Sequence, residues 1–162
     1  MILYTDGSYN KKISSDSTAY SAVIVTNESL TEYIVDIIYG VVTDPLYVSM
    51  WNVGGEIWGV LAGIDYIINQ YKVKDISLYY DYIGLGKWAT GEWRTKNPAT
   101  QSYARYMKNI MNDYNLTLNK VPGHSNILLN EVADKYANNG TKKFLKSGET
   151  STLLRNIHIP RK

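Results

Sequence analysis

Four acidic residues have positions that suit metal-ion chemistry: Asp6, Glu56, Asp81 and Asp134. Two of them close predicted strands, and the other two lie in the first half of predicted helices. Magnesium prefers hard oxygen ligands in octahedral geometry and usually keeps several of its waters. Two such ions about 4 Å apart can activate a water and stabilise a leaving oxygen during phosphodiester cleavage. A site of this kind needs several carboxylates from different elements, because one carboxylate cannot neutralise two divalent ions.

Each of these acids, taken alone, has an ordinary structural explanation. Asp-Gly-Ser at residues 6–8 is a frequent turn, and Asp81 is compatible with a cap at the end of a strand. Glu56 can favour the positive end of a helix dipole, and Asp134 can be a surface charge. For any single residue we favour the structural explanation, so the metal-site hypothesis depends on the joint placement of the four.

The elements that must position the acids follow from hydrophobic periodicity. Three β-rich runs with short polar links predict an antiparallel meander at residues 2–5, 18–27 and about 31–42. Apolar residues three and four positions apart predict a helix between residues 57 and 71. The rest of the chain predicts a strand at 73–80, a helical stretch at 83–113 broken near Gly91 and Pro98, a strand at 116–121 and a helix at about 127–144.

This order of elements predicts an α/β fold built on a five-stranded mixed sheet. Three antiparallel strands come first and two parallel strands follow, with helices on both faces. If the first and fourth strands are neighbours, Asp6 and Asp81 lie side by side. Glu56 and Asp134 can then approach them from their helices, which would complete the metal site.

The bulk composition narrows the class of protein. A length of 162 residues suits one domain, and 44% hydrophobic with 20% charged residues is typical of soluble globular proteins. The absence of cysteine excludes disulfides and thiolate zinc sites. We recognise neither a signal peptide nor a membrane-spanning apolar run, so we expect a cytoplasmic protein without a membrane partner. We expect one domain over residues 1–147 and a flexible basic tail over residues 148–162.

The net charge of +2 is unevenly distributed along the chain. Residues 87–108 carry a net +4 and residues 141–162 a net +5, which leaves −7 for the remainder. Basic segments beside an acidic remainder suit a protein that grips a polyanion and binds cations elsewhere. Two solvated faces would give the same pattern, and charge alone slightly favours that interpretation.

Short motifs surround all four acids. They are Asp-Gly-Ser at 6–8, Asn-Val-Gly-Gly-Glu at 52–56, Tyr-Asp-Tyr at 80–82, Val-Pro-Gly-His-Ser at 121–125 and Asn-Glu-Val-Ala-Asp at 130–134. In order and spacing they resemble the signatures of the type 1 ribonuclease H family, over residues 1–140. The Gly-His loop followed by Asn-Glu-x-Ala-Asp is highly specific, whereas Asp-Gly-Ser alone is weak.

The resemblance implies a ribonuclease H-like fold and an endonuclease that hydrolyses the RNA strand of RNA–DNA hybrids, leaving 5′-phosphate and 3′-hydroxyl ends. It implies catalysis by two Mg²⁺ ions, for which Mn²⁺ can substitute. The residues that hold these ions would be Asp6, Glu56, Asp81 and Asp134. His124, on a loop, would assist product departure or proton traffic, because an unperturbed histidine titrates near neutral pH. Asn52 and Asn130 would contact the nucleic acid, and we expect the protein to act as a monomer.

Residues 81–93 resemble a bacterial subgroup of this family whose members often carry an N-terminal hybrid-binding module related to viroplasmin. We expect no such module here, because the chain begins at the first predicted strand. The residues that match the family's grip on the DNA strand are Trp88, Trp93, Arg94 and Lys96. Aromatic faces pack against sugars or bases, and cations meet phosphates. Alternatively one tryptophan belongs to the core, and we expect Trp88 to be partly core and Trp93 to be the better contact.

Three departures from the family pattern concern the substrate grip rather than the metal ligands. Residues 9–15 replace a glycine-rich stretch, Ile83 replaces a polar residue and Asn126 replaces a glycine. Two other functions stay open: a DNA-cutting nuclease of the same fold, such as a resolvase or transposase-like enzyme, and a hybrid-binding protein without catalysis. The Gly-His loop with its following helix motif argues against the first, and the presence of all four acids argues against the second.

Overall fold

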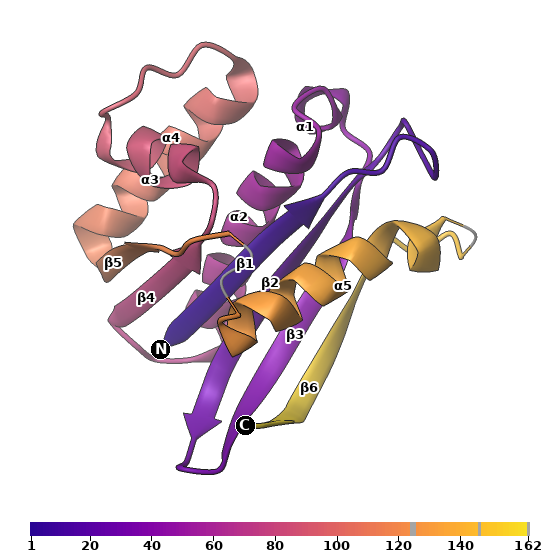
Figure 1. Ribbon diagram of the computed structural model, residues 1–162. Helices are drawn as coiled ribbons and strands as arrows, with labels where there is room; N and C mark the ends of the chain where they lie inside the picture. The colour runs from indigo at the N-terminus through magenta and orange to yellow at the C-terminus, as the bar shows by residue number, and fades with distance from the viewer. Residues whose placement is uncertain (124–125, 146, 162) are drawn as a thin grey trace.

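The computed structural model describes residues 1–123, 126–145 and 147–161. Helices cover both faces of a six-stranded mixed sheet with strand order β5-β4-β1-β2-β3-β6 (Figure 1). The strands are β1 (Ile2–Ser8), β2 (Thr18–Glu28), β3 (Glu32–Val42), β4 (Asp75–Tyr80), β5 (Asn115–Lys120) and β6 (Ser151–Pro160). The helices are α1 (Pro45–Val48), α2 (Asn52–Gln70), α3 (Ile83–Thr90), α4 (Pro98–Asp113) and α5 (Leu128–Phe144).

The central strand β1 has an antiparallel neighbour on one side and a parallel neighbour on the other. β2 pairs antiparallel with β1, and β3 pairs antiparallel with β2. β4 pairs parallel with β1, with Tyr4 opposite Tyr79, and β5 pairs parallel with β4. The predicted order of three antiparallel strands followed by two parallel ones is confirmed. Because parallel strands end at the same edge of a sheet, the residues at the ends of β1 and β4 are neighbours.

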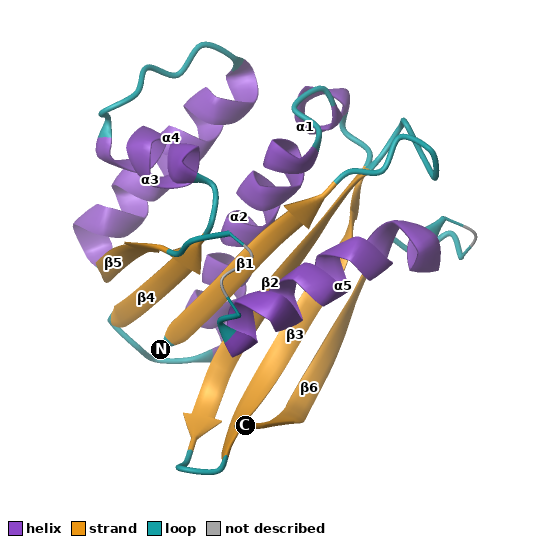
Figure 2. Cartoon of the chain, viewed as in Figure 1, coloured by secondary structure: helices purple, strands orange, loops and turns teal. Residues whose placement is uncertain are grey.

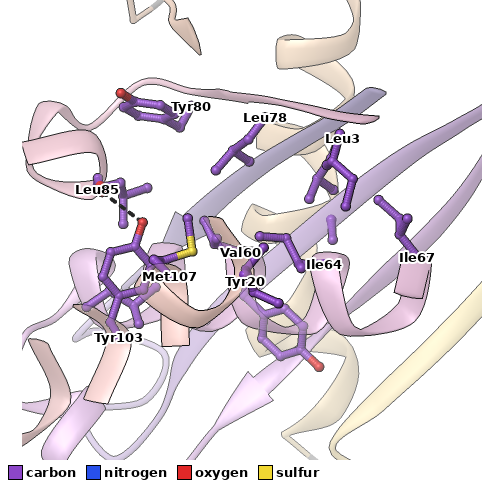
Figure 3. Packing of buried hydrophobic residues seen from close by; sticks show 14 of the residues in the cluster. Leu3, Tyr20, Val60, Ile64, Ile67, Leu78, Tyr80, Leu85, Tyr103 and Met107 are labelled. Atoms are coloured by element: carbon purple, nitrogen blue, oxygen red, sulfur yellow. Dashed lines mark hydrogen bonds between the residues drawn. The ribbon is translucent and has the colours of Figure 1, made fainter. Parts of the chain in front are cut away.

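Two hydrophobic layers hold the helices against the sheet, one on each face (Figure 2). Side chains alternate between the faces of a strand, so Ile24 of β2 joins the layer under α2, whereas Val23 joins the layer under α5. The first layer also reaches α3 and α4. There the buried hydroxyl of Tyr103 donates a hydrogen bond to the Leu85 carbonyl at 2.8 Å (Figure 3). No helix in the described ranges is long and apolar enough to span a bilayer.

The predicted break within residues 83–113 separates α3 from α4. Gly91 ends α3 with a φ of 83°, a left-handed conformation that favours glycine. Asn97 caps α4 by accepting a hydrogen bond from the Thr100 backbone N–H at 2.9 Å, and Pro98 occupies the first turn. The short connection between the helices carries several of the residues expected to contact nucleic acid.

The prediction of a five-stranded sheet is wrong, because residues 151–160 of the expected tail form a sixth strand, β6, antiparallel to β3. β6 lies at the edge of the sheet, and its register shifts between Val35 and Ile37 of β3. This irregularity interrupts the alternation by which a strand is recognised in a sequence. The guanidinium of Arg161 donates to the Glu28 carboxylate at 2.8 Å, so part of the second basic segment is neutralised within the sheet.

A buried carboxylate fastens β6 to the sheet at this register shift. Asp36 of β3 is 1% exposed and accepts hydrogen bonds from the hydroxyls of Tyr66 and Tyr71 at 2.7 and 2.8 Å. It also accepts one from the backbone N–H of Asn156 at 3.1 Å, and the Nε of Arg155 is 3.9 Å away. A buried charge is tolerated only when it is paired and hydrogen-bonded. The network therefore joins the end of α2 to both β3 and β6.

We predict that Tyr66→Phe and Tyr71→Phe each lower the free energy of unfolding by about 1.5–3 kcal/mol, because each removes a donor to the buried Asp36 carboxylate. Urea denaturation followed by circular dichroism measures the change. Tyr79→Phe is the matched control, since no hydrogen bond of its hydroxyl is found in the described part of the chain. If all three variants had the same stability, the Asp36 network would not be what holds β6.

Candidate active site

Three of the four predicted carboxylates meet at one edge of the sheet. One carboxylate oxygen from each of Asp6, Glu56 and Asp81 lies within 4.8 Å of the other two. Asp6 is in β1, Glu56 is in the first turns of α2 and Asp81 directly follows β4. The register that places Tyr4 opposite Tyr79 carries Asp6 to the level of Asp81 two residues later. The structure thus brings these residues together as the sequence predicted.

Glu56 reaches this edge because the start of α2 lies directly against the backbone of β1 and β2. A Cβ atom on Gly7 would lie 2.4 Å from both the Asn52 carbonyl oxygen and the Glu56 backbone nitrogen. A Cβ atom on Gly55 would lie 2.1 Å from the Ala19 carbonyl oxygen. Any larger residue would push the helix away, since real Cβ atoms do not approach other atoms so closely. These glycines thus set the distance between Glu56 and Asp6.

Asp134 approaches from α5, on the face of the sheet opposite α2 (Figure 1). Ser21 of β2 lies opposite Asp6 in the sheet and donates a hydrogen bond to the Ala133 carbonyl at 2.6 Å. This buried bond fixes the turn of α5 that carries Asp134 beside Asp6. Asp134 is exposed, whereas Asp6 and Glu56 are only 5% and 4% exposed. It stands outside the group of three and contributes a fourth carboxylate from the solvent side.

Asn138 orients the Asp134 carboxylate and was not among the residues predicted from sequence. Its amide nitrogen donates to Oδ2 of Asp134 at 3.2 Å, and its amide oxygen accepts from the Ser8 hydroxyl at 2.7 Å. The chain of hydrogen bonds therefore links the end of β1 to α5. Residues four apart share a helix face, so the spacing between Asp134 and Asn138 was the available signal.

Burial and mutual repulsion keep protons on the two innermost carboxyls. Burial, followed by the charge of Asp81, raises the pKa of Asp6 to about 8, and Asp134 adds to this rise. Burial also raises the pKa of Glu56 to about 10, again with repulsion from Asp81 and Asp6. Oε2 of Glu56 is buried without a hydrogen-bond partner among the described residues. Clustered hard oxygens with an unsatisfied buried atom fit a divalent cation, which would neutralise the repulsion.

Most of the residues predicted to contact nucleic acid come from the start of α2 and from α3 with its connection to α4. Asn52 is exposed at the first position of α2. Trp88 packs against the core, as expected, while Trp93 is 40% exposed and lies edge-on to it at 6.1 Å between ring centroids. Arg94 and Lys96 are exposed on the connection between α3 and α4.

The structure does not place Asn130 or His124 at an exposed position of the site. Asn130 is only 5% exposed, and its Oδ1 has no hydrogen-bond partner within the described ranges. Its predicted contact with nucleic acid therefore concerns a side chain that is buried in this conformation. His124 lies outside the described residues, so its predicted role stays a prediction from sequence.

Comparisons with known proteins identify the fold. No family model and no curated protein matches the chain. Among solved structures, RNase H1 from the halophilic archaeon Halobacterium salinarum NRC-1 is 19% identical, with a TM-score of 0.68 over 88% of this chain and 97% of that one. The N-terminal RNase H domain of a Mycobacterium tuberculosis protein is 18% identical, with a TM-score of 0.67 over 91% and 97%. LC11-RNase H1, solved in complex with RNA/DNA hybrid, is 16% identical, with a TM-score of 0.63 over 90% and 99%. The chain has the ribonuclease H-like fold.

The raised pKa values predict how metal-free stability depends on pH. A carboxyl whose folded-state pKa is raised contributes stability that is complete below its unfolded pKa and is lost as the pH rises through its folded pKa. For Asp6 this window runs from about 4 to about 8. In EDTA, we therefore expect the wild-type Tm to fall between pH 5 and pH 8, and Asp6→Asn to reduce that slope. Scanning fluorimetry across this range measures both.

The matched control for this experiment is Asp113→Asn, which changes an exposed acid at the end of α4. It should keep the wild-type slope. Added Mg²⁺ should raise the wild-type Tm most at the alkaline end, where the unbound carboxylates repel one another most strongly. An Asp6→Asn protein with the full wild-type slope would show that this cluster does not control the pH dependence.

Proposed function

We propose that this protein is a ribonuclease H, an endonuclease that hydrolyses the RNA strand of RNA–DNA hybrids and leaves 5′-phosphate and 3′-hydroxyl ends. The observation that carries the proposal is the convergence of Asp6, Glu56 and Asp81 within 4.8 Å, with Asp134 beside them. These are the acids that the family motifs single out. The ribonuclease H-like fold supports the proposal, as does a structural neighbour solved with RNA/DNA hybrid.

The metal ligands in this proposal are Asp6, Glu56, Asp81 and Asp134. When bound, two Mg²⁺ ions, or Mn²⁺ in their place, lower the pKa of an attacking water and stabilise the leaving 3′-oxygen. Asp6 and Glu56 supply buried negative charge in a fixed place, because the sheet and the α2 backbone hold them. Asn138, itself hydrogen-bonded by the Ser8 hydroxyl, orients the Asp134 carboxylate through its Oδ2. The protein therefore provides a preorganised set of oxygens rather than a side-chain nucleophile.

Substrate contacts are proposed on the residues that flank these acids. Asn52 lies at the start of α2, where the RNA strand would approach Glu56, and contacts to the 2′-hydroxyl would distinguish RNA from DNA. Trp93 and Arg94, with Trp88 behind them and Lys96 beside them, would hold the DNA strand by stacking and by phosphate contacts. Two roles are proposed from the sequence alone: His124 assists product departure or proton traffic, and Asn130 contacts the nucleic acid.

The proposal also covers oligomeric state, location and subgroup. We propose that the protein acts as a monomer in the cytoplasm. Its closer resemblance, to the bacterial subgroup linked to viroplasmin, rests on residues 81–93. Two different functions compete with it: cleavage of DNA alone, and binding of hybrids without catalysis. Both can be distinguished in one assay, because they differ in which strand is cut and in whether any strand is cut.

We predict that the purified protein cuts only the RNA strand of an end-labelled hybrid, in Mg²⁺ or Mn²⁺ but not in EDTA. Asp81→Asn removes one carboxylate charge from the cluster, and we expect it to lower kcat by at least about 100-fold while the circular dichroism spectrum stays unchanged. Gel electrophoresis of hybrid, DNA duplex and RNA duplex substrates gives the cleaved strand. The end groups follow from whether the products are substrates for a 3′-hydroxyl-dependent polymerase.

Asp113→Asn again provides the control, because it removes an equivalent charge from an exposed position at the end of α4. Cleavage of duplex DNA at a comparable rate would favour the DNA-cutting alternative. Binding of the hybrid without cleavage in either metal would favour the non-catalytic one. Full activity in Asp81→Asn would show that the metal ligands have been wrongly assigned.

A further inference from the structure

Two aromatic side chains flank the carboxylate cluster at a position that the family motifs do not include. Trp51 immediately precedes α2, and its side chain is 63% exposed. The Tyr9 ring stacks on it, with centroids 6.5 Å apart and planes 30° from parallel. Tyr9 directly follows β1, and it begins the segment that replaces the family's glycine-rich stretch. The pair therefore joins the chain just beyond Asp6 to the chain just before Glu56.

The backbone at Trp51 is in a conformation that a tryptophan adopts at a cost. Its φ of 57° and ψ of −131° lie in a region that favours glycine. Strained positions of this kind cluster at functional sites. The exposed indole gains little from burial in return. A residue that costs stability and exposes an aromatic face beside a catalytic centre is typical of a binding position.

The backbone of Trp51 and the hydroxyl of Tyr9 each form a hydrogen bond to a neighbouring residue. The Trp51 carbonyl accepts a hydrogen bond from the Thr18 hydroxyl at 2.7 Å. The Tyr9 hydroxyl donates to the Ser15 carbonyl at 3.3 Å, which closes the loop between β1 and β2. These two contacts and the stacking of the rings restrain the pair, which reduces the conformational freedom lost when a ligand stacks on it.

The charge of the neighbouring loop indicates what that ligand is. Lys11 and Lys12 are exposed two and three residues after Tyr9, and neither forms an ion pair with another described residue. Asp16 is the acid in the same loop, and it is also exposed. Aromatic faces interleaved with unneutralised cations are the usual surface for a nucleic-acid strand, because bases and sugars stack while phosphates meet lysine.

The distance from Asp6 to Tyr9 is also compatible with a bound nucleic-acid strand. Tyr9 follows Asp6 by three residues, which in extended chain is about 10 Å. A nucleic-acid strand advances about 3.4 Å per nucleotide, so a strand cut at the carboxylates reaches the aromatic pair within about three nucleotides. Tyr9 belongs to the loop between β1 and β2, and Trp51 precedes α2, whereas Trp88 is in α3 and Trp93 is in the connection that follows it. Figure 1 shows α3 near β4 and β5, away from the loop between β1 and β2.

We propose that Tyr9 and Trp51, with Lys11 and Lys12 beside them, form a second nucleic-acid contact surface on the β2 side of the carboxylates, where a sugar or base of the substrate stacks on the aromatic pair. This inference rests on the proposed function. It assigns a substrate grip to the segment in which the chain departs from the family pattern.

The test compares hybrid binding and turnover in Trp51→Ala, Tyr9→Ala and Trp51→Phe. Loss of a stacking ring should raise KM and the Kd for hybrid by about tenfold for Trp51→Ala, while kcat stays near the wild-type value and Trp51→Phe retains most of the affinity. Fluorescence anisotropy of labelled hybrid in the Asp81→Asn background gives the Kd without cleavage. Leu30→Ala is the control, since Leu30 is a 96% exposed side chain in the β2–β3 turn.

Trp51→Gly separates binding from folding. Glycine relieves the strained backbone, so this variant should keep the wild-type Tm or exceed it, yet bind hybrid as weakly as Trp51→Ala. A purely structural tryptophan would give a lower Tm instead. Replacing Lys11 and Lys12 by alanine should reduce the slope of log Kd against log salt by about one unit for each lysine that meets a phosphate.

The outcomes distinguish this inference from the proposed function. If the wild-type protein cuts hybrid while the Trp51 and Tyr9 variants keep its KM and Kd, the second contact surface is refuted and the ribonuclease function stands. If the wild-type protein neither cuts nor binds hybrid, the proposed function itself has failed, and the inference fails with it.

Discussion

Glu56 can approach Asp6 only because the backbone of α2 touches the backbone of β1 and β2. That contact requires the absence of side chains at Gly7 and Gly55, where a Cβ atom would collide with main-chain atoms. Once the helix lies so close, its first turns deliver a carboxylate to the strand edge where β1 and β4 both end. The candidate active site is therefore a consequence of main-chain packing, and the acids themselves add repulsion that the packing must withstand.

This repulsion links the stability of the fold to its chemistry. Asp6 and Glu56 are only 5% and 4% exposed. Burial and the charge of Asp81 raise the pKa of both carboxyls far above the usual value when no cation is bound. A divalent ion favours the charged forms and so removes the penalty. The same residues thus destabilise the metal-free protein near neutral pH, and a bound divalent cation would remove this cost. Asp36 shows the contrasting solution, since hydroxyl and amide donors satisfy that buried carboxylate directly.

Most of the architecture could be predicted from local patterns. The meander, the helix at α2 and the break between α3 and α4 follow from periodicity and from the signals at Gly91 and Pro98. Two of the four acids close strands and the other two lie in the first half of helices, as predicted. Strand β6 was missed because an edge strand with a register shift lacks regular alternation, and because its anchor, Asp36, lies over a hundred residues earlier in the chain. Long-range partners of this kind leave no local signal.

The residues of the candidate site and the proposed contact surface also divide into those that the sequence indicates and those that only the structure shows. Asp6 and Asp81 were predicted to meet once β1 and β4 were taken as neighbours, which is a topological argument. Asn138 and Trp51 were overlooked, the first because its role depends on the Ser8 hydroxyl across the fold, and the second because a strained backbone angle cannot be read from sequence.

Anomalous diffraction from crystals soaked in Mn²⁺ tests the central claim most directly, namely that carboxylates from β1, α2, β4 and α5 form one divalent-metal site. The account predicts Mn²⁺ peaks coordinated by Asp6, Glu56 and Asp81, with Asp134 joining when a second ion is bound, at distances of about 2.0–2.3 Å. Mn²⁺ bound elsewhere, with the carboxylate cluster empty at saturating metal, would contradict it.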